Sequence, residues 1–389
     1  MHSFVPELEA ELAELEVEHR RRACPEMSGQ SRTRPRFARH PAPLRSFSSN
    51  DYLGLAGHPD LASAAAEAAL REGFGASASR LVTGDLPAHR ALERDLADYV
   101  SRPAALVFPT GYQTNLGVLG ALARPGDLIV SDALNHASLI DGCRLSRARI
   151  EVYPHGDARA ARQLLAAGKD ARRRLLVTES LFSMDGDVAP LSELAEAAET
   201  TQAVLIVDEA HALGVAGPEG RGLCAAAGIV PDVLVGTLGK AFGAAGGFAA
   251  GAPAFRDLLV NRARTFVFTT ALPPPVAAAA RAALKLITAP EGTRRRAALD
   301  TNRLLLGNRL AAAGLVPGPA PGPILPVVLG SETRALGASA ALAARGFFVP
   351  AIRPPTVPAG TSRLRVTLSS AHTPEDVADL AEALIEACA

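Results

Sequence analysis

The sequence predicts an α/β fold with a mostly parallel central sheet flanked by helices. Short apolar runs alternate with longer amphipathic runs through the middle of the chain, a pattern typical of βα units. Several short runs are apolar throughout, so both faces of the sheet should be covered. A chain of 389 residues is also long enough for two or three packed units.

The expected elements of this sheet follow one another between residues 87 and 268. The strands are expected at Ala104–Phe108, Leu128–Ser131, Ile150–Tyr153, Leu175–Glu179, Val204–Asp208, Val233–Gly236, Gly247–Ala250 and Phe266–Phe268. Helices are expected between many of them, for example at Pro87–Val100, Leu139–Arg147 and Leu191–Thr200. The apolar run 241–255 is short for a membrane span, and we interpret it as buried strand and turn.

The pattern changes after about Leu286, which divides the chain into three expected regions. Residues 1–45 form an N-terminal helical segment, with the helix at 7–22, and residues 46–285 form the large domain. Residues 286–389 form a smaller α+β domain, in which a Pro/Gly-rich hinge follows the first helix. Its elements are expected at Arg294–Ala313, Ile324–Leu329, Thr333–Arg345, Phe347–Ile352, Leu364–Leu368 and from Glu375 onward.

The composition excludes several classes of function. Positive and negative charges balance, which argues against a surface dedicated to nucleic acid or anionic membrane. The four cysteines are far apart and form no Cys-x-x-Cys pair, so neither a metal site nor a disulfide framework is indicated. The N-terminus is acidic where a signal peptide would be basic and then apolar. We therefore expect a cytoplasmic protein without nucleic-acid, membrane or metal partners.

An acid at a strand end marks the first candidate site. The apolar run Val204–Asp208 ends in a carboxylate, and His211 follows three residues later. Ligands of open α/β sheets bind beyond the carboxyl ends of the strands. The simpler alternative is that Asp208 caps a helix and His211 is a satisfied polar residue.

The segment Asp208–His211 also spells Asp-Glu-Ala-His, a motif of helicase-type nucleotide hydrolysis. That function requires a phosphate loop ending in Gly-Lys-Ser/Thr. The only Gly-Lys pair is Gly239-Lys240, which Ala241 follows, and Leu234 stands where the first glycine of the loop belongs. The helicase interpretation therefore fails at both ends of the motif.

Lys240 is the second candidate. It follows the strand Val233–Gly236 in a turn of small residues, in a chain that uses arginine far more often than lysine. An amine forms a Schiff base through its neutral form, which desolvation favours. A carboxylate at Asp208 could then keep a pyridine nitrogen protonated, and His211 could bind the phenolic oxygen of the same ring. The alternative is an ordinary lysine on a surface loop.

Two further segments complete the expected site. The chain leaves the strand Ala104–Phe108, turns at Gly111-Tyr112 and enters a helix, whose N–H groups could bind a phosphate with help from the hydroxyl of Thr237. His136 follows another strand, and its imidazole could stack on a pyridine ring, although a loop histidine near a helix cap is the simpler alternative.

Six segments together closely resemble the α-oxoamine synthases, a group of fold-type I pyridoxal-phosphate-dependent transferases. They keep the order and spacing of that family from about residue 20 to the end. The matching segments are Phe47–Leu55, Leu134–Ser138, Phe182–Asp187, Asp208–His211, Thr237–Ala241 and Phe268–Pro274.

The resemblance implies a role for each matching position. Lys240 is implied as the cofactor lysine and the acid and base, Asp208 as the partner of the ring nitrogen, His211 as that of the phenolic oxygen, and His136 as the stacking residue. Further cofactor contacts are implied at Gly111, Tyr112, Ser183 and Thr237, and at Thr269 and Thr270 from the second subunit of a homodimer. Substrate contacts are implied at Asn50, Arg365, Thr356, and Arg20 or Arg21.

The segment Ala351–Thr361 resembles the branch of the family that serves biotin synthesis. The implied reaction joins L-alanine to a pimeloyl thioester, on CoA or an acyl carrier protein, with loss of carbon dioxide. Arg20 or Arg21 would bind the distal carboxylate, and His19 stands where a leucine is common. Glycine C-acetyltransferase is the main alternative within the family. An aminotransferase of the same fold and a non-catalytic cofactor-binding regulator are more distant ones.

Overall fold

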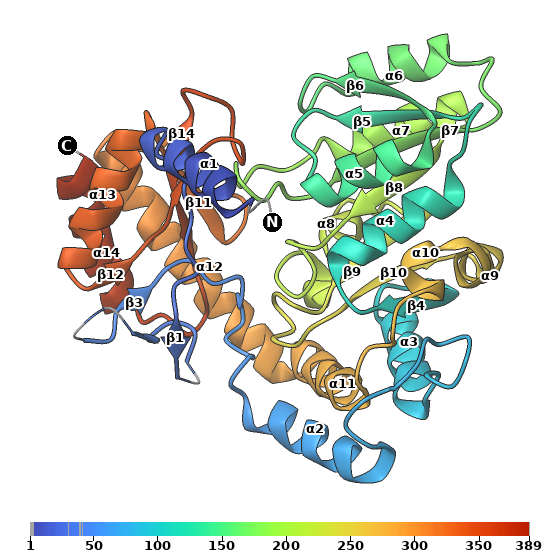
Figure 1. Cartoon of the computed structure of the whole chain (residues 1–389), viewed down its shortest axis with the longest axis horizontal. Helices are drawn as coiled ribbons and strands as arrows, with labels where there is room; N and C mark the ends of the chain where they lie inside the picture. Colours follow the sequence, from blue (N-terminus) through green and yellow to red (C-terminus); the bar gives the residue numbers. More distant parts are fainter. Residues whose placement is uncertain (1–3, 30, 39, 41, 389) are drawn as a thin grey trace. The chain divides into compact units, whose positions relative to one another are not determined.

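The chain folds into two compact units in this computed structural model, which describes residues 4–29, 31–38, 40 and 42–388 (Figure 1). The large unit comprises residues 50–299, and the small unit comprises the described residues up to Ser49 together with those from Asp300 onward. The N-terminal segment, expected as a separate region, thus belongs with the C-terminal residues. The reason is pairing: β3 (Arg45–Ser46) runs parallel to β12 (Phe347–Phe348).

The large unit is built on a seven-stranded sheet in the order β4-β10-β9-β8-β7-β5-β6. All neighbouring strands are parallel except that β10 runs antiparallel to both β4 and β9. The prediction of a mostly parallel sheet is therefore confirmed. The strands are β4 (Ala104–Phe108), β5 (Leu128–Asp132), β6 (Arg149–Tyr153), β7 (Arg174–Glu179), β8 (Val204–Asp208), β9 (Val233–Thr237) and β10 (Gly247–Gly251).

Helices cover both faces of this sheet. On one face, Ile206 belongs to a core that includes residues of α4, α5 and α9. On the other face, Leu205 and Val207 belong to a core that includes residues of α6 and α7. This two-sided burial explains why the strands are apolar throughout. The helices are α2 (Pro59–Glu72), α3 (Pro87–Tyr99), α4 (Gly111–Leu122), α5 (Ala137–Ser146), α6 (Ala158–Ala167), α7 (Leu191–Thr201), α8 (Leu223–Ala226), α9 (Pro253–Arg262), α10 (Arg264–Val267) and α11 (Pro274–Thr288).

One expected strand is wrong. The run Phe266–Phe268 lies mostly in the short helix α10, and the N–H of Phe266 donates to the carbonyl oxygen of Ala263 at 2.9 Å. Three apolar residues cannot distinguish a strand from a helical turn by periodicity. Here tertiary packing decides, because the ring of Phe266 packs edge-on against Phe108 with the ring centroids 5.8 Å apart.

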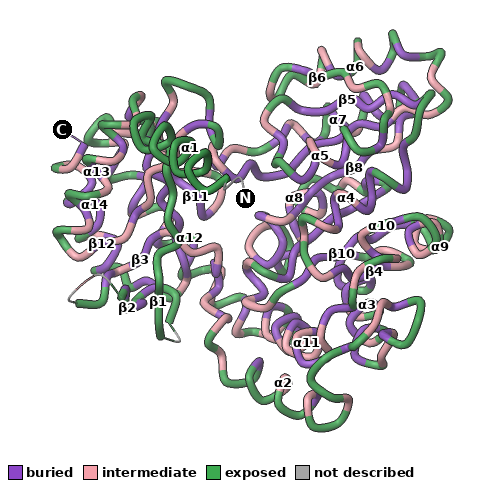
Figure 2. The backbone as a smooth tube through the Cα atoms, in the orientation of Figure 1, coloured by how far each residue is buried: buried purple, intermediate pink, exposed green. Residues whose placement is uncertain are grey.

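The small unit is an α+β structure with a three-stranded antiparallel sheet in the order β11-β14-β13. The helix α12 (Pro290–Ala312) spans the boundary between the units. Figure 2 shows α1 (Val5–Val17) as exposed along its whole length. The other elements are β1 (Met27–Ser28), β2 (Arg36–Phe37), β11 (Ile324–Gly330), α13 (Glu332–Ala344), β13 (Ala351–Ile352), β14 (Ser362–Thr367) and α14 (Pro374–Cys388).

Candidate functional site

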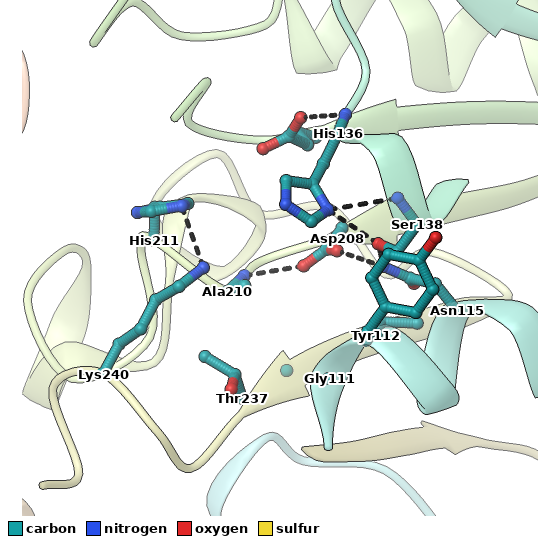
Figure 3. Close-up of a pocket in the computed structure, with 13 residues that line it drawn as sticks. Gly111, Tyr112, Asn115, His136, Ser138, Asp208, Ala210, His211, Thr237 and Lys240 are labelled. Carbon is teal, nitrogen blue, oxygen red and sulfur yellow. Dashed lines mark hydrogen bonds between the residues drawn. The ribbon is translucent and has the colours of Figure 1, made fainter. Parts of the chain in front are cut away.

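A cavity of about 160 Å³ opens where β7, β8 and β9 reach their carboxyl ends (Figure 3). This is the edge at which ligands of open α/β sheets bind. Seven residues predicted from the sequence line it, and all belong to the large unit. The complete lining is Gly111, Tyr112, Asn115, His136, Ser138, Glu179, Asp208, Ala210, His211, Val235, Gly236, Thr237 and Lys240.

Lys240 and His211 contact each other inside this cavity. The Nζ atom of Lys240 lies 2.8 Å from Nε2 of His211, and Nδ1 of the same ring lies 2.5 Å from the hydroxyl of Tyr52. Tyr52 is fully buried and donates in turn to Oδ1 of Asn50 at 3.2 Å. The amine of Lys240 is thus the end of a hydrogen-bonded chain that starts at a predicted substrate residue.

Asp208 is the last residue of β8 and lies in the same cavity. Its carboxylate accepts from the amide of Asn115 at 2.7 Å and from the N–H of Ala210 at 2.8 Å. β8 and β9 are parallel neighbours, so the residues that follow β9, including Lys240, reach the edge where Asp208 stands.

A second buried carboxyl lies beside Asp208. Glu179 ends β7 and is paired with Asp208 in the register of the two strands. Burial, followed by repulsion from Asp208, raises the pKa of Glu179 to about 8. One of its oxygens, Oε1, accepts from the N–H of His136 at 2.6 Å. Glu179 therefore anchors the segment that carries the predicted stacking residue.

His136 caps the N-terminus of α5 with its ring. Its Nδ1 atom lies 2.8 Å from Oγ of Ser138 and accepts from the N–H of Ser138 at 3.2 Å. Burial lowers the pKa of His136, an effect that Lys240 reinforces and Asp208 opposes. The imidazole is thus held in a fixed orientation, in a setting that disfavours its charged form.

The N-terminus of α4 approaches Thr237 closely. Phe108 at the end of β4 and Thr237 at the end of β9 both pair with Gly247, the first residue of β10. A Cβ at Gly111 would lie 3.3 Å from Oγ1 of Thr237, and one at Gly247 would lie 2.7 Å from Cα of Gly111. The two glycines thus allow a helix N-terminus to approach a hydroxyl closely, and N–H groups beside a hydroxyl are suited to binding a phosphate group.

These groups fit pyridoxal phosphate, the cofactor implied by the resemblance. The cavity combines an amine, a carboxylate, an imidazole and a helix N-terminus at one sheet edge. A phosphate, a pyridine nitrogen and an aldehyde each find a partner of suitable chemistry in this set. The N-terminus of α4 and Thr237 would hold the phosphate, Asp208 the ring nitrogen, and Lys240 the aldehyde carbon.

The remaining predicted cofactor residues lie elsewhere. Ser183 is buried in the turn after β7 and does not belong to the lining of this cavity. Thr269 lines a separate cavity of about 10 Å³ together with Arg80 and His89, and Thr270 is exposed. In the single chain, neither Thr269 nor Thr270 contributes to the lining of the cavity around Lys240.

The predicted substrate residues are divided between the units. Asn50 belongs to the large unit, whereas Arg365 and Thr356 belong to the small unit. Arg365 is buried in β14 and donates to Oγ1 of Thr367 at 3.2 Å. Thr356 is exposed and accepts from Arg22 at 3.1 Å.

The arginines at the N-terminus differ in their contacts. Arg20 forms an ion pair with Glu18 at 3.0 Å, and Arg21 forms a longer one with Glu16 at 3.6 Å. Arg22 is the member of this run that donates to Thr356. The resemblance implied a substrate contact at Arg20 or Arg21, which precede Arg22 in this run.

Sequence reasoning missed three polar residues of the cavity. Asn115 lies four residues after Gly111 on α4 and so shares its face, and Ser138 lies two residues after His136. Glu179 ends a strand in the same way as Asp208 does. The sequence therefore contained a signal for Glu179, because this acid ends a second apolar strand.

Within residues 4–29, 31–38, 40 and 42–388, no group of three or more His, Cys, Asp or Glu side chains is arranged to hold a metal ion. Among the same residues, none of the helices has the length and apolar character needed to span a membrane.

The sequence matches the protein family described as aminotransferase class I and II over residues 43–384. Two similar proteins are 8-amino-7-oxononanoate synthases. That of Methylococcus capsulatus is 52% identical over 349 residues, which are 89% of each chain. That of Bordetella petrii is 49% identical over 383 residues, which are 97% of this chain and 96% of the relative.

Two solved structures are also similar to this chain. A serine palmitoyltransferase from S. paucimobilis with a bound PLP–myriocin aldimine superposes with a TM-score of 0.91 at 30% identity, covering 100% of this chain and 98% of that one. An 8-amino-7-oxononanoate synthase from Francisella tularensis gives 0.75 at 28% identity, covering 88% and 97%. The chain therefore belongs to the aminotransferase class I and II family and, within it, to the 8-amino-7-oxononanoate synthases, which are acyltransferases of biotin synthesis that depend on pyridoxal 5′-phosphate.

Proposed function

We propose that this protein condenses L-alanine with a pimeloyl thioester to give 8-amino-7-oxononanoate, carbon dioxide and a free thiol. The observation that carries the proposal is the amine of Lys240, hydrogen-bonded to His211 in the cavity that Asp208 also lines. The names of the relatives support the product. The resemblance of the segment Ala351–Thr361 supports the substrate pair.

Lys240 is proposed as the group that moves protons. When bound, pyridoxal phosphate supplies an electron-accepting ring for the carbanion formed at Cα of alanine. The neutral amine of Lys240 takes the proton from Cα and later returns one to the product. His211 orients this amine through the contact at 2.8 Å.

The bond changes balance without an oxidant or reductant. A carbon–carbon bond forms between Cα of alanine and the thioester carbonyl, and the carbon–sulfur bond breaks to release the thiol. The bond from Cα to the carboxylate then breaks to release carbon dioxide, and a proton replaces it. In this scheme Asp208 supplies the negative charge beside the ring nitrogen, and His136 covers one face of the ring.

The substrate carboxylates require cations or amide donors. Asn50 and Arg365 are proposed to bind the carboxylate of alanine. For the distal carboxylate of the pimeloyl group, the sequence offers Arg20 and Arg21. We add Arg22 to these candidates because its side chain reaches Thr356, which is itself a proposed acyl contact.

A homodimer with shared active sites is part of the proposal, with Thr269 and Thr270 contacting the cofactor of the other subunit. Three large apolar side chains that are mostly exposed support the homodimer, namely Phe74 (78% exposed), Val82 (75%) and Phe268 (71%). Their segments adjoin, since the N–H of Ala271 donates to the carbonyl oxygen of Ala78 at 3.0 Å. Large apolar side chains gathered in this way mark a surface for association. Light scattering, which measures the molar mass in solution, tests whether the protein is a dimer.

A cytoplasmic location stays a prediction.

A substrate panel tests the reaction. Alanine, glycine and serine are each combined with pimeloyl, acetyl, succinyl and palmitoyl thioesters, and the ketone product is identified by mass. We expect the product of alanine and the pimeloyl thioester to dominate. Glycine with the acetyl thioester would instead indicate glycine C-acetyltransferase, and pyruvate from alanine alone would indicate transamination. Parallel assays with CoA and acyl carrier protein thioesters identify the carrier.

A further inference from the structure

The side-chain amide of Asn115 connects two groups of the cavity that come from different strands. Asn115 lies on α4 and is almost completely buried. Its Nδ2 atom donates to Oδ2 of Asp208 at 2.7 Å and to Oγ of Ser138 at 2.9 Å. Ser138 in turn contacts Nδ1 of His136 at 2.8 Å. Figure 3 shows this chain of contacts.

The partners of the amide fix its orientation. Both oxygens of Asp208 accept hydrogen bonds, one from Asn115 and the other from the N–H of Ala210. An amide can donate only through its nitrogen, so the NH₂ group of Asn115 must face Asp208. The carbonyl oxygen, Oδ1, is then buried and finds no hydrogen-bond partner among the described residues. A buried oxygen without a hydrogen bond costs free energy, but this orientation lets one amide hydrogen reach Asp208 and the other reach Ser138.

The same logic assigns the tautomer of His136. Because Oγ of Ser138 accepts from Asn115, the hydroxyl hydrogen of Ser138 is directed to Nδ1 of His136. The N–H of Ser138 also donates to this nitrogen. A nitrogen that accepts carries no hydrogen, so a neutral imidazole bears its hydrogen on Nε2. Burial favours the neutral ring, consistent with the lowered pKa of His136.

We propose that Asn115 is a positioning residue that couples the carboxylate of Asp208 to the imidazole of His136. Through one hydrogen it holds Asp208 in the orientation that meets the ring nitrogen of the cofactor. Through the other hydrogen, relayed by Ser138, it selects the Nε2–H tautomer of His136. This inference rests on the roles proposed above for Asp208 and His136.

Cofactor affinity tests the first arm of this chain. Asn115→Leu keeps the approximate shape of the side chain and removes both donors. Titration of the cofactor-free variant with pyridoxal phosphate should give a Kd raised by about 10-fold or more, because a hydrogen bond to a charged group is lost. Asn302→Leu, which changes another buried asparagine, in the small unit, should leave this Kd within about 2-fold of the wild type.

The ring nitrogens of His136 test the second arm. Protein labelled with ¹⁵N at histidine, with the signals of His136 identified by their loss in His136→Asn, should show hydrogen on Nε2 in the wild type. Ser138→Ala removes the hydroxyl donor but keeps the N–H that donates to Nδ1, so the Nε2–H tautomer should still be present with a larger share of the Nδ1–H tautomer than in the wild type. Hydrogen on Nδ1 in the wild type would overturn the proposal without any variant at Asn115, even if Asn115→Leu fails to fold.

The two proposals fail in different ways. If Asp208→Asn binds pyridoxal phosphate as tightly as the wild type, the role proposed for Asp208 is wrong. If Asp208→Asn weakens binding but a folded Asn115→Leu does not, the role of Asp208 stands and that of Asn115 is wrong. If both variants weaken binding and His136 carries its hydrogen on Nε2, both proposals are supported.

Discussion

The cavity of the large unit and the N-terminal arginine segment of the small unit hold their functional side chains in different ways. In the cavity, Asp208 ends a buried strand and accepts two hydrogen bonds from neighbouring residues. In the small unit, Arg22 is exposed and donates a hydrogen bond to the exposed Thr356. The residues proposed for the chemistry are thus held by burial and strand position, whereas the arginines proposed for acyl recognition are exposed.

Among the variants that test this difference between the two regions, replacement of the Lys240 amine should have the largest effect on activity. Lys240→Ala removes both the proposed proton carrier and the covalent attachment point of the cofactor, so activity should fall by about 10³-fold or more. The visible absorption of the attached cofactor should also disappear. Lys285→Ala is the matched control because it changes an exposed lysine on α11, and a visible band retained by Lys240→Ala would refute the assignment.

Neutralising the buried acid should have the next largest effect. Asp208→Asn keeps the size of the side chain but removes the charge that we expect beside the ring nitrogen. The kcat should fall by about 10²-fold, as expected for the loss of one preorganised electrostatic contact. Asp98→Asn, at an exposed position on α3, should keep the wild-type kcat, and an equally active Asp208→Asn would show that the carboxylate only supports the fold.

The arginine run offers a way to sharpen the comparison. If Arg22 binds the distal carboxylate, Arg22→Ala should raise KM for the pimeloyl thioester by about 10-fold while kcat changes less. Arg20→Ala and Arg21→Ala serve as comparators, since acidic residues of α1 or its C-terminus already pair with both. With the methyl ester of the pimeloyl group, which lacks the distal charge, the wild type and Arg22→Ala should have similar KM values.

The smallest expected effect concerns the stability of the cofactor-free protein. Burial raises the pKa of Glu179 in the folded state to about 8, from an ordinary value of 4.5. The stability linked to its proton is therefore complete below pH 4.5 and is lost as the pH rises through 8. Glu179→Gln should flatten this dependence, as measured by urea titrations at several pH values across this range. An unchanged pH dependence would mean that Glu179 stays ionised.

The large unit was predictable because its strands have sharp apolar boundaries. The ranges expected for β4 and β8 agree with the structure, and the others differ by one residue at an end. Asp208, His211 and Lys240 meet in one cavity, as expected from their places after neighbouring strands. The exception is Phe266–Phe268, where three apolar residues contain no periodicity and packing against Phe108 favours a helical turn.

Other features could not follow from the pattern of a single chain. The pairing of β3 with β12 joins residues about 300 positions apart, and neither strand is long enough to predict its partner. The role of Asn115 could not be predicted because its partners, Asp208 and Ser138, lie far from it in the sequence. The contact of Arg22 with Thr356 depends on the path of an exposed loop.

The reversed direction of β10 has a consequence for how this enzyme can vary. Since β10 starts where β4 and β9 stop, a bare backbone at Gly247 forms the floor under the first turn of α4. A Cβ at Gly247 would lie only 2.7 Å from Cα and 2.8 Å from the backbone nitrogen of Gly111, so any larger residue would force this turn or the strand to shift. Variation at this position is therefore expected to affect folding and the proposed binding of phosphate together, because backbone atoms of the first turn of α4 or of β10 would have to move.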